Sequence, residues 1–181
     1  MTAGDGTTIN LALTDSEPPP ADQPYPAGAP NVVVIVLDDL GFAQLGCYGS
    51  DLDTPNIDRL AERGVRFTNF HTTAVCSPTR ACLLTGRNHH RVGMGMLPDL
   101  PINFPGYTGI FPESVSTLAE ILRDQGYATT AIGKWHLVPR DQRATGPFDM
   151  WPTGVGFERY YGFLNGETNQ WTPNLIRDQS H

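Results

Sequence analysis

Hydrophobic residues gather in short runs from position 31 onward, and polar turns separate these runs. The first run, residues 32–37, is six apolar residues, mostly β-branched, with no polar residue among them. A run without polar alternation is typical of a strand covered on both faces, as in a parallel sheet with helices on each side. Residues 65–70 and 127–132 are predicted to be the next two strands.

Three helices are predicted around these strands, over residues 54–64, 77–86 and 118–126. The first two begin with a threonine or serine followed by proline, and all three end at a glycine. The third has apolar residues at helical spacing. The alternation of strands and helices predicts an α/β fold, a doubly wound, mainly parallel sheet flanked by helices.

Residues 1–30 differ in composition from the rest of the chain. They hold six of the 16 prolines, four acidic residues and no lysine or arginine. Such a segment has no periodic apolar face, so it is predicted to be a disordered or extended, Pro-rich acidic leader. The folded domain is therefore expected to comprise residues 31–181.

Composition and charge exclude several classes of protein. Hydrophobic residues make up 39% of the 181 residues, which permits a core and excludes wholesale disorder. The net charge of −7 argues against a nucleic-acid partner, because phosphate groups require a positive surface. No apolar run approaches the roughly 20 residues that span a bilayer, so no membrane partner is expected.

Cysteine usage and the start of the sequence bear on the compartment. The first residues carry neither the basic start nor the apolar stretch of a signal peptide. Three cysteines, Cys47, Cys76 and Cys82, cannot all pair. Reduced thiols and a cytoplasmic location are therefore predicted.

Polar side chains follow each of the three predicted strands. These clusters are Asp38 with Asp39, residues 76–80, and Lys134 with His136. In doubly wound sheets ligands bind beyond the carboxyl ends of the strands. We therefore expect the three clusters to meet at one edge of the sheet.

Asp38 and Asp39 place two carboxylates side by side at the end of a strand. Unpaired carboxylates repel each other, so a hard cation such as Ca²⁺ or Mg²⁺ suits them. The alternative is one capping aspartate beside a solvated neighbour. Taken alone, the pair favours this alternative.

Cys76 and Arg80 lie at the start of the second predicted helix. The amino end of a helix favours anions and lowers the pKa of a thiol, and an arginine one turn later can bind an oxyanion with two hydrogen bonds. The alternative is a small buried cysteine beside a surface arginine.

Lys134 and His136 are two residues apart, so on an extended segment they face the same side. Together they offer a fixed cation and a group that moves protons near neutral pH. The alternative is a strand end with two exposed polar residues and Trp135 packed beneath them.

Two longer stretches resemble signatures of the sulfatase family. Residues 76–87, CSPTRACLLTGR, resemble its first signature, and residues 126–136, GYATTAIGKWH, resemble its second. Residues 54–61, TPNIDRLA, and residues 37–39, LDD, are also similar to the family. On these motifs the chain is identified as the amino-terminal part of an arylsulfatase-like, formylglycine-dependent member of the alkaline phosphatase-like superfamily.

The resemblance implies a sulfuric ester hydrolase with an alkaline phosphatase-like fold. A formylglycine-generating maturation enzyme would oxidise Cys76, and the hydrated aldehyde would attack a small sulfate ester. Asp38, Asp39 and the modified Cys76 would bind a divalent metal, Ca²⁺ or Mg²⁺, that polarises the sulfate oxygens.

The resemblance also implies roles for three further residues. Arg80 would steady the hydrate and the metal-side carboxylate, and Lys134 would bind the sulfate. His136 would hydrogen-bond the hydrate and help remove its proton.

The family's second Asp-Asn or Asp-Gln metal pair, with a later His and Lys, is not found after the second signature. We therefore expect residues 31–181 to form the first part of a truncated catalytic domain that is inactive alone. Two alternatives stay open at this point: a phosphonate or phosphodiester hydrolase of the same superfamily, and a non-catalytic fragment.

Overall fold

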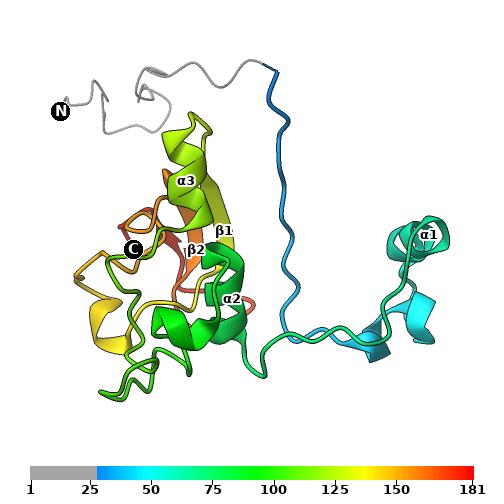
Figure 1. The fold of residues 1–181 in the computed structure, drawn as a ribbon, viewed down its shortest axis with the longest axis horizontal. Helices are drawn as coiled ribbons and strands as arrows, with labels where there is room; N and C mark the ends of the chain where they lie inside the picture. The colour runs from blue at the N-terminus through cyan, green and yellow to red at the C-terminus, as the bar shows by residue number, and fades with distance from the viewer. Residues whose placement is uncertain (1–27) are drawn as a thin grey trace.

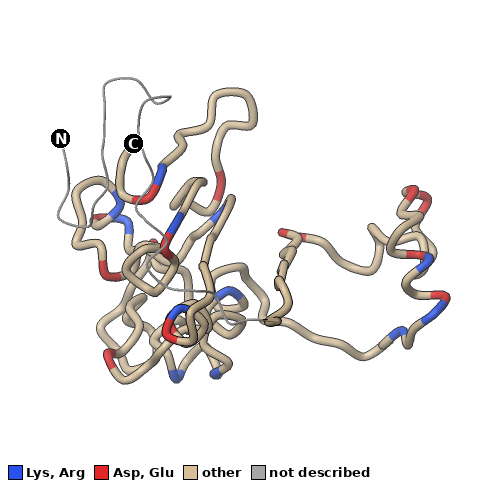
Figure 2. The backbone as a smooth tube through the Cα atoms, turned by 90° about the horizontal axis from the view of Figure 1, so that it is seen from above, with Lys and Arg blue, Asp and Glu red and all other residues tan. Residues whose placement is uncertain are grey.

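The computed structural model describes residues 28–181, so the predicted leader lies almost wholly outside the described residues. The described part divides into an arm, residues 28–75, and a body, residues 76–181. Figure 1 shows the arm leaving the body as an extended segment and reaching its farthest point at helix α1, and Figure 2 shows the same separation from above. No helix within the described residues is long and apolar enough to cross a membrane.

The body contains two helices and a sheet. Its helices are α2 (Cys76–Thr85) and α3 (Leu118–Asp124), with the short 3-10 helices η4 (His89–Val92) and η5 (Arg140–Gln142). Its strands are β1 (Thr130–Lys134), β2 (Arg159–Phe163) and β3 (Ile176–Arg177). The arm contains η2 (Phe42–Gln44), η3 (Gly46–Tyr48) and α1 (Pro55–Arg63).

The sheet is mixed, with the order β1-β2-β3 among the described residues. β1 and β2 are parallel, with Ile132 opposite Tyr161, and β3 is antiparallel to β2, with Gly162 opposite Ile176. β1 confirms the third predicted strand, which begins later than expected. The α/β arrangement is confirmed in this coarse form, whereas the doubly wound, mainly parallel sheet is not formed by the described residues.

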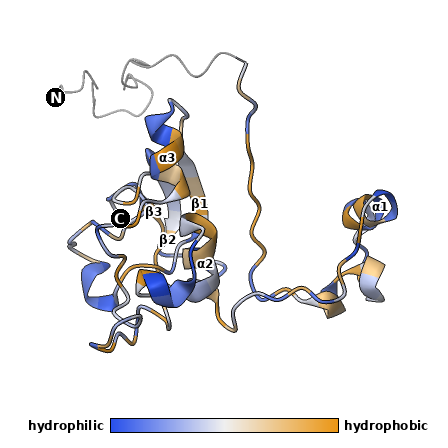
Figure 3. Cartoon of the chain, in the orientation of Figure 1, coloured by the Kyte–Doolittle hydropathy of each residue, from blue (hydrophilic) through white to orange (hydrophobic). Residues whose placement is uncertain are grey.

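The other two predicted strands, residues 32–37 and 65–70, are wrong. Neither segment pairs with a strand, and Val33 and Ile35 are 82% and 80% exposed. A strand needs a neighbour for its backbone hydrogen bonds, and an apolar run is buried only where another surface covers it. β1 is an edge strand whose Ile132 is 79% exposed, and Figure 3 shows the hydrophobic first segment standing away from it.

The three predicted helices are confirmed, with small shifts at their ends. α1 begins at Pro55 and ends before Gly64, as expected. α2 begins at Cys76, one residue earlier than expected, and ends at Gly86, whose φ of 64° is the left-handed conformation that glycine adopts without strain. α3 begins with a reciprocal pair of hydrogen bonds between Thr117 and Glu120, which satisfies two free backbone N–H groups.

Among the described residues, the buried core lies in the body, between α2, β1, β2 and the loops after them. Burial of these side chains removes apolar surface from water, which is the main favourable contribution to folding. The core comprises Ala81, Val92, Met94, Trp135, Leu137, Val138, Met150, Trp151, Val155, Tyr160, Leu164 and Ile176.

Candidate active site

The amino end of α2 is fixed to the segment that follows β1. The hydroxyl of Ser77 donates to the backbone oxygen of His136 at 2.6 Å, and both residues are buried. The backbone N–H groups of Trp135 and His136 donate to the carbonyls of Phe163 and Leu164, at 3.0 and 3.1 Å, and so extend the parallel pairing past the end of β1. The segments that carry two of the predicted clusters are therefore in contact.

Asp38 brings the third cluster to the same place. Its carboxylate lies 2.7 Å from the Nζ of Lys134 and 3.6 Å from a guanidinium nitrogen of Arg80. Arg80 also donates to the backbone oxygen of Lys134 at 2.7 Å. One carboxylate of the arm thus lies between two cations of the body, although residues 32–37 before it form no strand.

The two cations favour the charged form of Asp38. Burial acts to raise the pKa of this carboxyl, but the hydrogen bond and charge of Lys134, together with the charge of Arg80, outweigh it and hold the pKa below its ordinary value. Asp38 is therefore a carboxylate at neutral pH.

Cys76 and His136 form the second contact of the site. The Sγ of Cys76 lies 3.1 Å from the Nδ1 of His136, so the imidazole faces the first residue of α2. Gly166 packs closely against the ring: a Cβ atom added at this glycine would lie only 2.6 Å from the Cε1 of His136. His136 also has a positive φ of 55°, an uncommon conformation for a residue with a side chain.

Asp99 and Arg143 complete this contact, and sequence reasoning missed both. Asp99 Oδ2 lies 2.7 Å from the Nε2 of His136, and its Oδ1 lies 2.7 Å from Arg143. Arg143 is oriented by the backbone oxygen of Val138 at 3.0 Å and the side-chain oxygen of Asn165 at 2.9 Å. Asp99 lies in a loop between prolines, with no spacing that relates it to His136, so no sequence signal identifies it.

The surroundings of His136 keep its ring neutral. Burial lowers its pKa, and this effect exceeds the opposite influence of the Asp99 carboxylate, so the pKa lies below the ordinary value of 6.5. A neutral imidazole can accept a proton, as a general base must.

Asp39 is exposed beside Asp38, with a φ of 53°. Carboxylate oxygens suit Ca²⁺ and Mg²⁺, so the chemistry of this pair fits a hard cation. The described residues contain no group of three His, Cys, Asp or Glu side chains that could hold a metal. The two aspartates can therefore supply some of the ligands of a hard cation, but they are not a complete ligand set.

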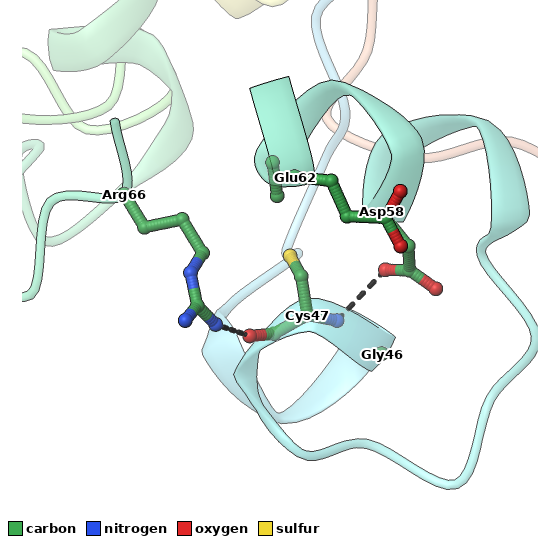
Figure 4. Close-up of a pocket in the computed structure, with 6 residues that line it drawn as sticks. Gly46, Cys47, Asp58, Glu62 and Arg66 are labelled. Atoms are coloured by element: carbon green, nitrogen blue, oxygen red, sulfur yellow. Dashed lines mark hydrogen bonds between the residues drawn. The ribbon is translucent and has the colours of Figure 1, made fainter. Parts of the chain in front are cut away.

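A hollow of about 360 Å³ lies elsewhere, on the arm between η3 and α1. Figure 4 shows Cys47 facing α1 there, with its backbone N–H donating to Asp58 at 2.7 Å and its carbonyl accepting from Arg66. None of the residues predicted to act on a substrate lines this hollow.

Comparison with known sequences gives a consistent assignment. The family model described as Sulfatase matches residues 30–180. The chain is 44% identical over 147 residues to an uncharacterised sulfatase of Schizosaccharomyces pombe, covering 77% of this chain and 25% of that protein. It is 44% identical over 139 residues to human arylsulfatase A, covering 75% of this chain and 25% of that protein. The chain thus spans about a quarter of the length of these relatives.

Comparison with solved structures supports the same fold. The crystal structure of Ps i-CgsB in complex with k-i-k-neocarrahexaose matches 80% of this chain and 35% of that chain, with 30% identity and a TM-score of 0.61. Together with the sequence match, this likeness supports an alkaline phosphatase-like α/β fold.

Proposed function

The chain belongs to the sulfatase family, and we propose that its protein hydrolyses a small sulfate ester in an arylsulfatase-like reaction. The observation that carries the proposal is the 3.1 Å contact between Cys76 and the Nδ1 of His136. It places a proton acceptor beside the residue that the first family signature assigns as the precursor of the nucleophile.

We propose that a maturation enzyme converts Cys76 to formylglycine. Formylglycine supplies a geminal diol, of which one hydroxyl attacks sulfur while the other allows sulfate to leave as the aldehyde returns. The position of residue 76 at the amino end of α2 favours negative charge there, because the first N–H groups of a helix have no partner within it. His136 accepts the proton of the attacking hydroxyl at Nδ1.

Lys134 binds the sulfate group in this proposal, and Arg80 steadies the hydrate beside it. Their side chains are 11% and 14% exposed and already hold the carboxylate of Asp38, so they present positive charge in a partly buried site. Cations fixed in such a place stabilise the charge that develops on sulfate oxygens in the transition state.

Asp38 and Asp39 are proposed to contribute to a divalent metal site, Ca²⁺ or Mg²⁺. The metal would polarise the sulfate oxygens, and residue 76 would lie beside it. The two carboxylates supply oxygen donors, whereas Ca²⁺ takes about six to eight oxygen ligands. Further ligands must therefore join this pair in an active protein.

A chimera tests the proposed function. Residues 31–180 replace the matching segment of human arylsulfatase A, and the protein is coexpressed with a formylglycine-generating enzyme. We expect hydrolysis of an aryl sulfate in the presence of Ca²⁺ and almost none after Cys76→Ala. Lys134→Ala should lower the rate by about 10²–10³, the effect of losing one contact to the transition-state charge.

Two results would contradict the proposal. Near-native turnover by the Cys76→Ala chimera would exclude residue 76 as the nucleophile. Turnover of an aryl phosphodiester without turnover of the aryl sulfate would favour the phosphodiester hydrolase.

The cytoplasmic location stays a prediction from the cysteines. Cell fractionation of a fluorescent fusion tests it, and absence of the fusion from the cytosolic fraction would contradict it.

A further inference from the structure

Each ring nitrogen of His136 has its own partner, on opposite sides of the imidazole. Nδ1 faces the Sγ of Cys76 at 3.1 Å, and Nε2 faces Oδ2 of Asp99 at 2.7 Å. The side chain of His136 is 6% exposed, so water has little access to either nitrogen. The protein side chains around the ring therefore decide which nitrogen carries the proton.

The chemistry of Asp99 settles that choice. An ionised carboxylate only accepts hydrogen bonds. Burial acts to raise the pKa of Asp99, but Arg143 and His136 outweigh burial and hold this pKa below its ordinary value. The Nε2 of neutral His136 must then carry the hydrogen and donate it to Asp99. Nδ1 is left with its lone pair directed at residue 76.

Asp99 is itself held in place from behind. Its second oxygen accepts from Arg143 at 2.7 Å. Arg143 in turn donates to the backbone oxygen of Val138 and to Asn165. If the carboxylate turned away from His136, Arg143, whose side chain is only 13% exposed, would lose this partner.

We propose that Asp99 is a positioning residue that fixes His136 as the Nε2–H tautomer, so that Nδ1 is the atom that accepts the proton at residue 76. The proposal rests on the proposed function for the reaction that Nδ1 serves. Asp99 acts through His136 and has no contact with Cys76 among the described hydrogen bonds. Second partners of histidine set the tautomer in other sites by the same principle.

Asp99→Asn provides a sharp test, because its effect on the tautomer can be derived. Arg143 needs an acceptor, so the amide oxygen of the new side chain faces Arg143 and its NH₂ group faces His136. An NH₂ group donates. Nε2 must then accept, and the ring proton moves to Nδ1, which can no longer act as the acceptor at residue 76.

The measurement is the ¹⁵N spectrum of the histidine rings in the full 181-residue chain at about pH 8, well above the ordinary pKa of histidine. The resonances of His136 are assigned by their loss in His136→Gln. We expect a protonated Nε2 and an unprotonated Nδ1 in the wild type, and the reverse in Asp99→Asn. A protonated Nδ1 in the wild type overturns the proposal, whether or not the variant folds.

Two control variants separate this role from general effects. Asp141→Asn removes the same charge from an exposed residue and should leave the ring of His136 unchanged. Arg143→Met removes the support but keeps the accepting carboxylate, so the Nε2–H tautomer should persist. An unchanged tautomer in a folded Asp99→Asn, or a reversed tautomer in Arg143→Met, overturns the proposal.

The test does not depend on catalysis. A failure to convert Cys76 would contradict the proposed function and leave the assignment of the ring nitrogens intact. The wrong tautomer would remove the role of Asp99 and leave sulfate hydrolysis possible by another proton acceptor.

Discussion

The arm and the body differ in whether their hydrophobic residues are buried. The arm carries six consecutive apolar residues, 32–37, which are between 44% and 82% exposed. The body has no run of that length, yet it holds every residue of the buried core. The difference shows that an apolar run becomes a buried strand only when a second surface covers it.

The site lies where these two regions meet. Asp38 belongs to the arm, whereas Arg80 and Lys134, which bind it, belong to the body. The pair of Cys76 and His136 belongs to the body alone. The proton-accepting part of the site therefore rests on the packed core, and the acidic part depends on where the arm lies.

The largest difference between the arm and the body, in the free energy of unfolding lost on substitution, is expected for aromatic residues. Trp151 is fully buried and Phe67 of the arm is 64% exposed. Trp151→Ala should lower the free energy of unfolding by about 3–5 kcal/mol, through lost burial and a cavity. Phe67→Ala should change it by about 0.5 kcal/mol or less. Urea unfolding monitored by circular dichroism measures both, and equal effects would contradict the division into arm and body.

The next largest loss of stability is expected when a serine hydroxyl is removed from the body. Ser77→Ala leaves the buried backbone oxygen of His136 without the hydroxyl that donates to it, which should cost about 1–3 kcal/mol. Ser50→Ala on the arm removes an exposed hydrogen bond to the N–H of Leu52 and is the matched control. A loss at Ser50 as large as that at Ser77 would show that the arm is as tightly packed as the body.

The sequence predicted helices better than strands, for a local reason. The ends of α1 and α2 are specified by residues beside them, such as Pro55 and Gly86. The strand at 32–37 requires a distant partner that the described residues do not provide. β2 and β3 were missed for the same reason, since their pairing is decided by residues far along the chain.

The same distinction applies to the candidate site. Five of the six predicted residues lie in two contacting groups, Asp38 with Arg80 and Lys134, and Cys76 with His136. Helix α2 and the segment at the end of β1 carry four of them, whereas the residues before Asp38 form no strand. Asp39 makes none of the hydrogen bonds described above. Asp99 could not be predicted, since 37 residues separate it from His136 and only tertiary packing brings the two together. The catalytic roles stay predictions.

Lowering the pH should show how much the charged carboxyl of Asp99 contributes to the stability of the fold. The pKa of this carboxyl is lowered in the folded chain, because Arg143 and His136 outweigh the effect of burial. The unfolded chain therefore takes up the proton first as the pH falls, and the stability that the charged carboxyl contributes is present above about pH 4 and is lost below it. Asp99→Asn should flatten the acid limb of stability against pH. Asp51→Asn, at an exposed position of the arm, should leave that limb unchanged.

A small effect on stability is also expected where the arm and the body touch. Asp38→Asn weakens the contacts with Lys134 and Arg80, but the aspartate side chain is 40% exposed. The free energy of unfolding should change by at most about 1 kcal/mol, as for other solvent-exposed ion pairs. Limited proteolysis should nevertheless cut the arm faster, and an unchanged cleavage rate would show that other contacts hold the arm in place.

The central claim is that Cys76 is the precursor of the nucleophile, and the mass of one peptide tests it most directly. Trypsin releases residues 67–80, which contain Cys76, separately from residues 81–87, which contain Cys82. After coexpression of the 181-residue chain with a formylglycine-generating enzyme, peptide 67–80 should be lighter by about 18 Da. The maturation enzyme oxidises the CH₂–SH group to an aldehyde, so the side chain loses its sulfur and two hydrogens and gains one oxygen. Peptide 81–87 should keep its mass. An unmodified thiol in peptide 67–80 under these conditions would contradict the claim.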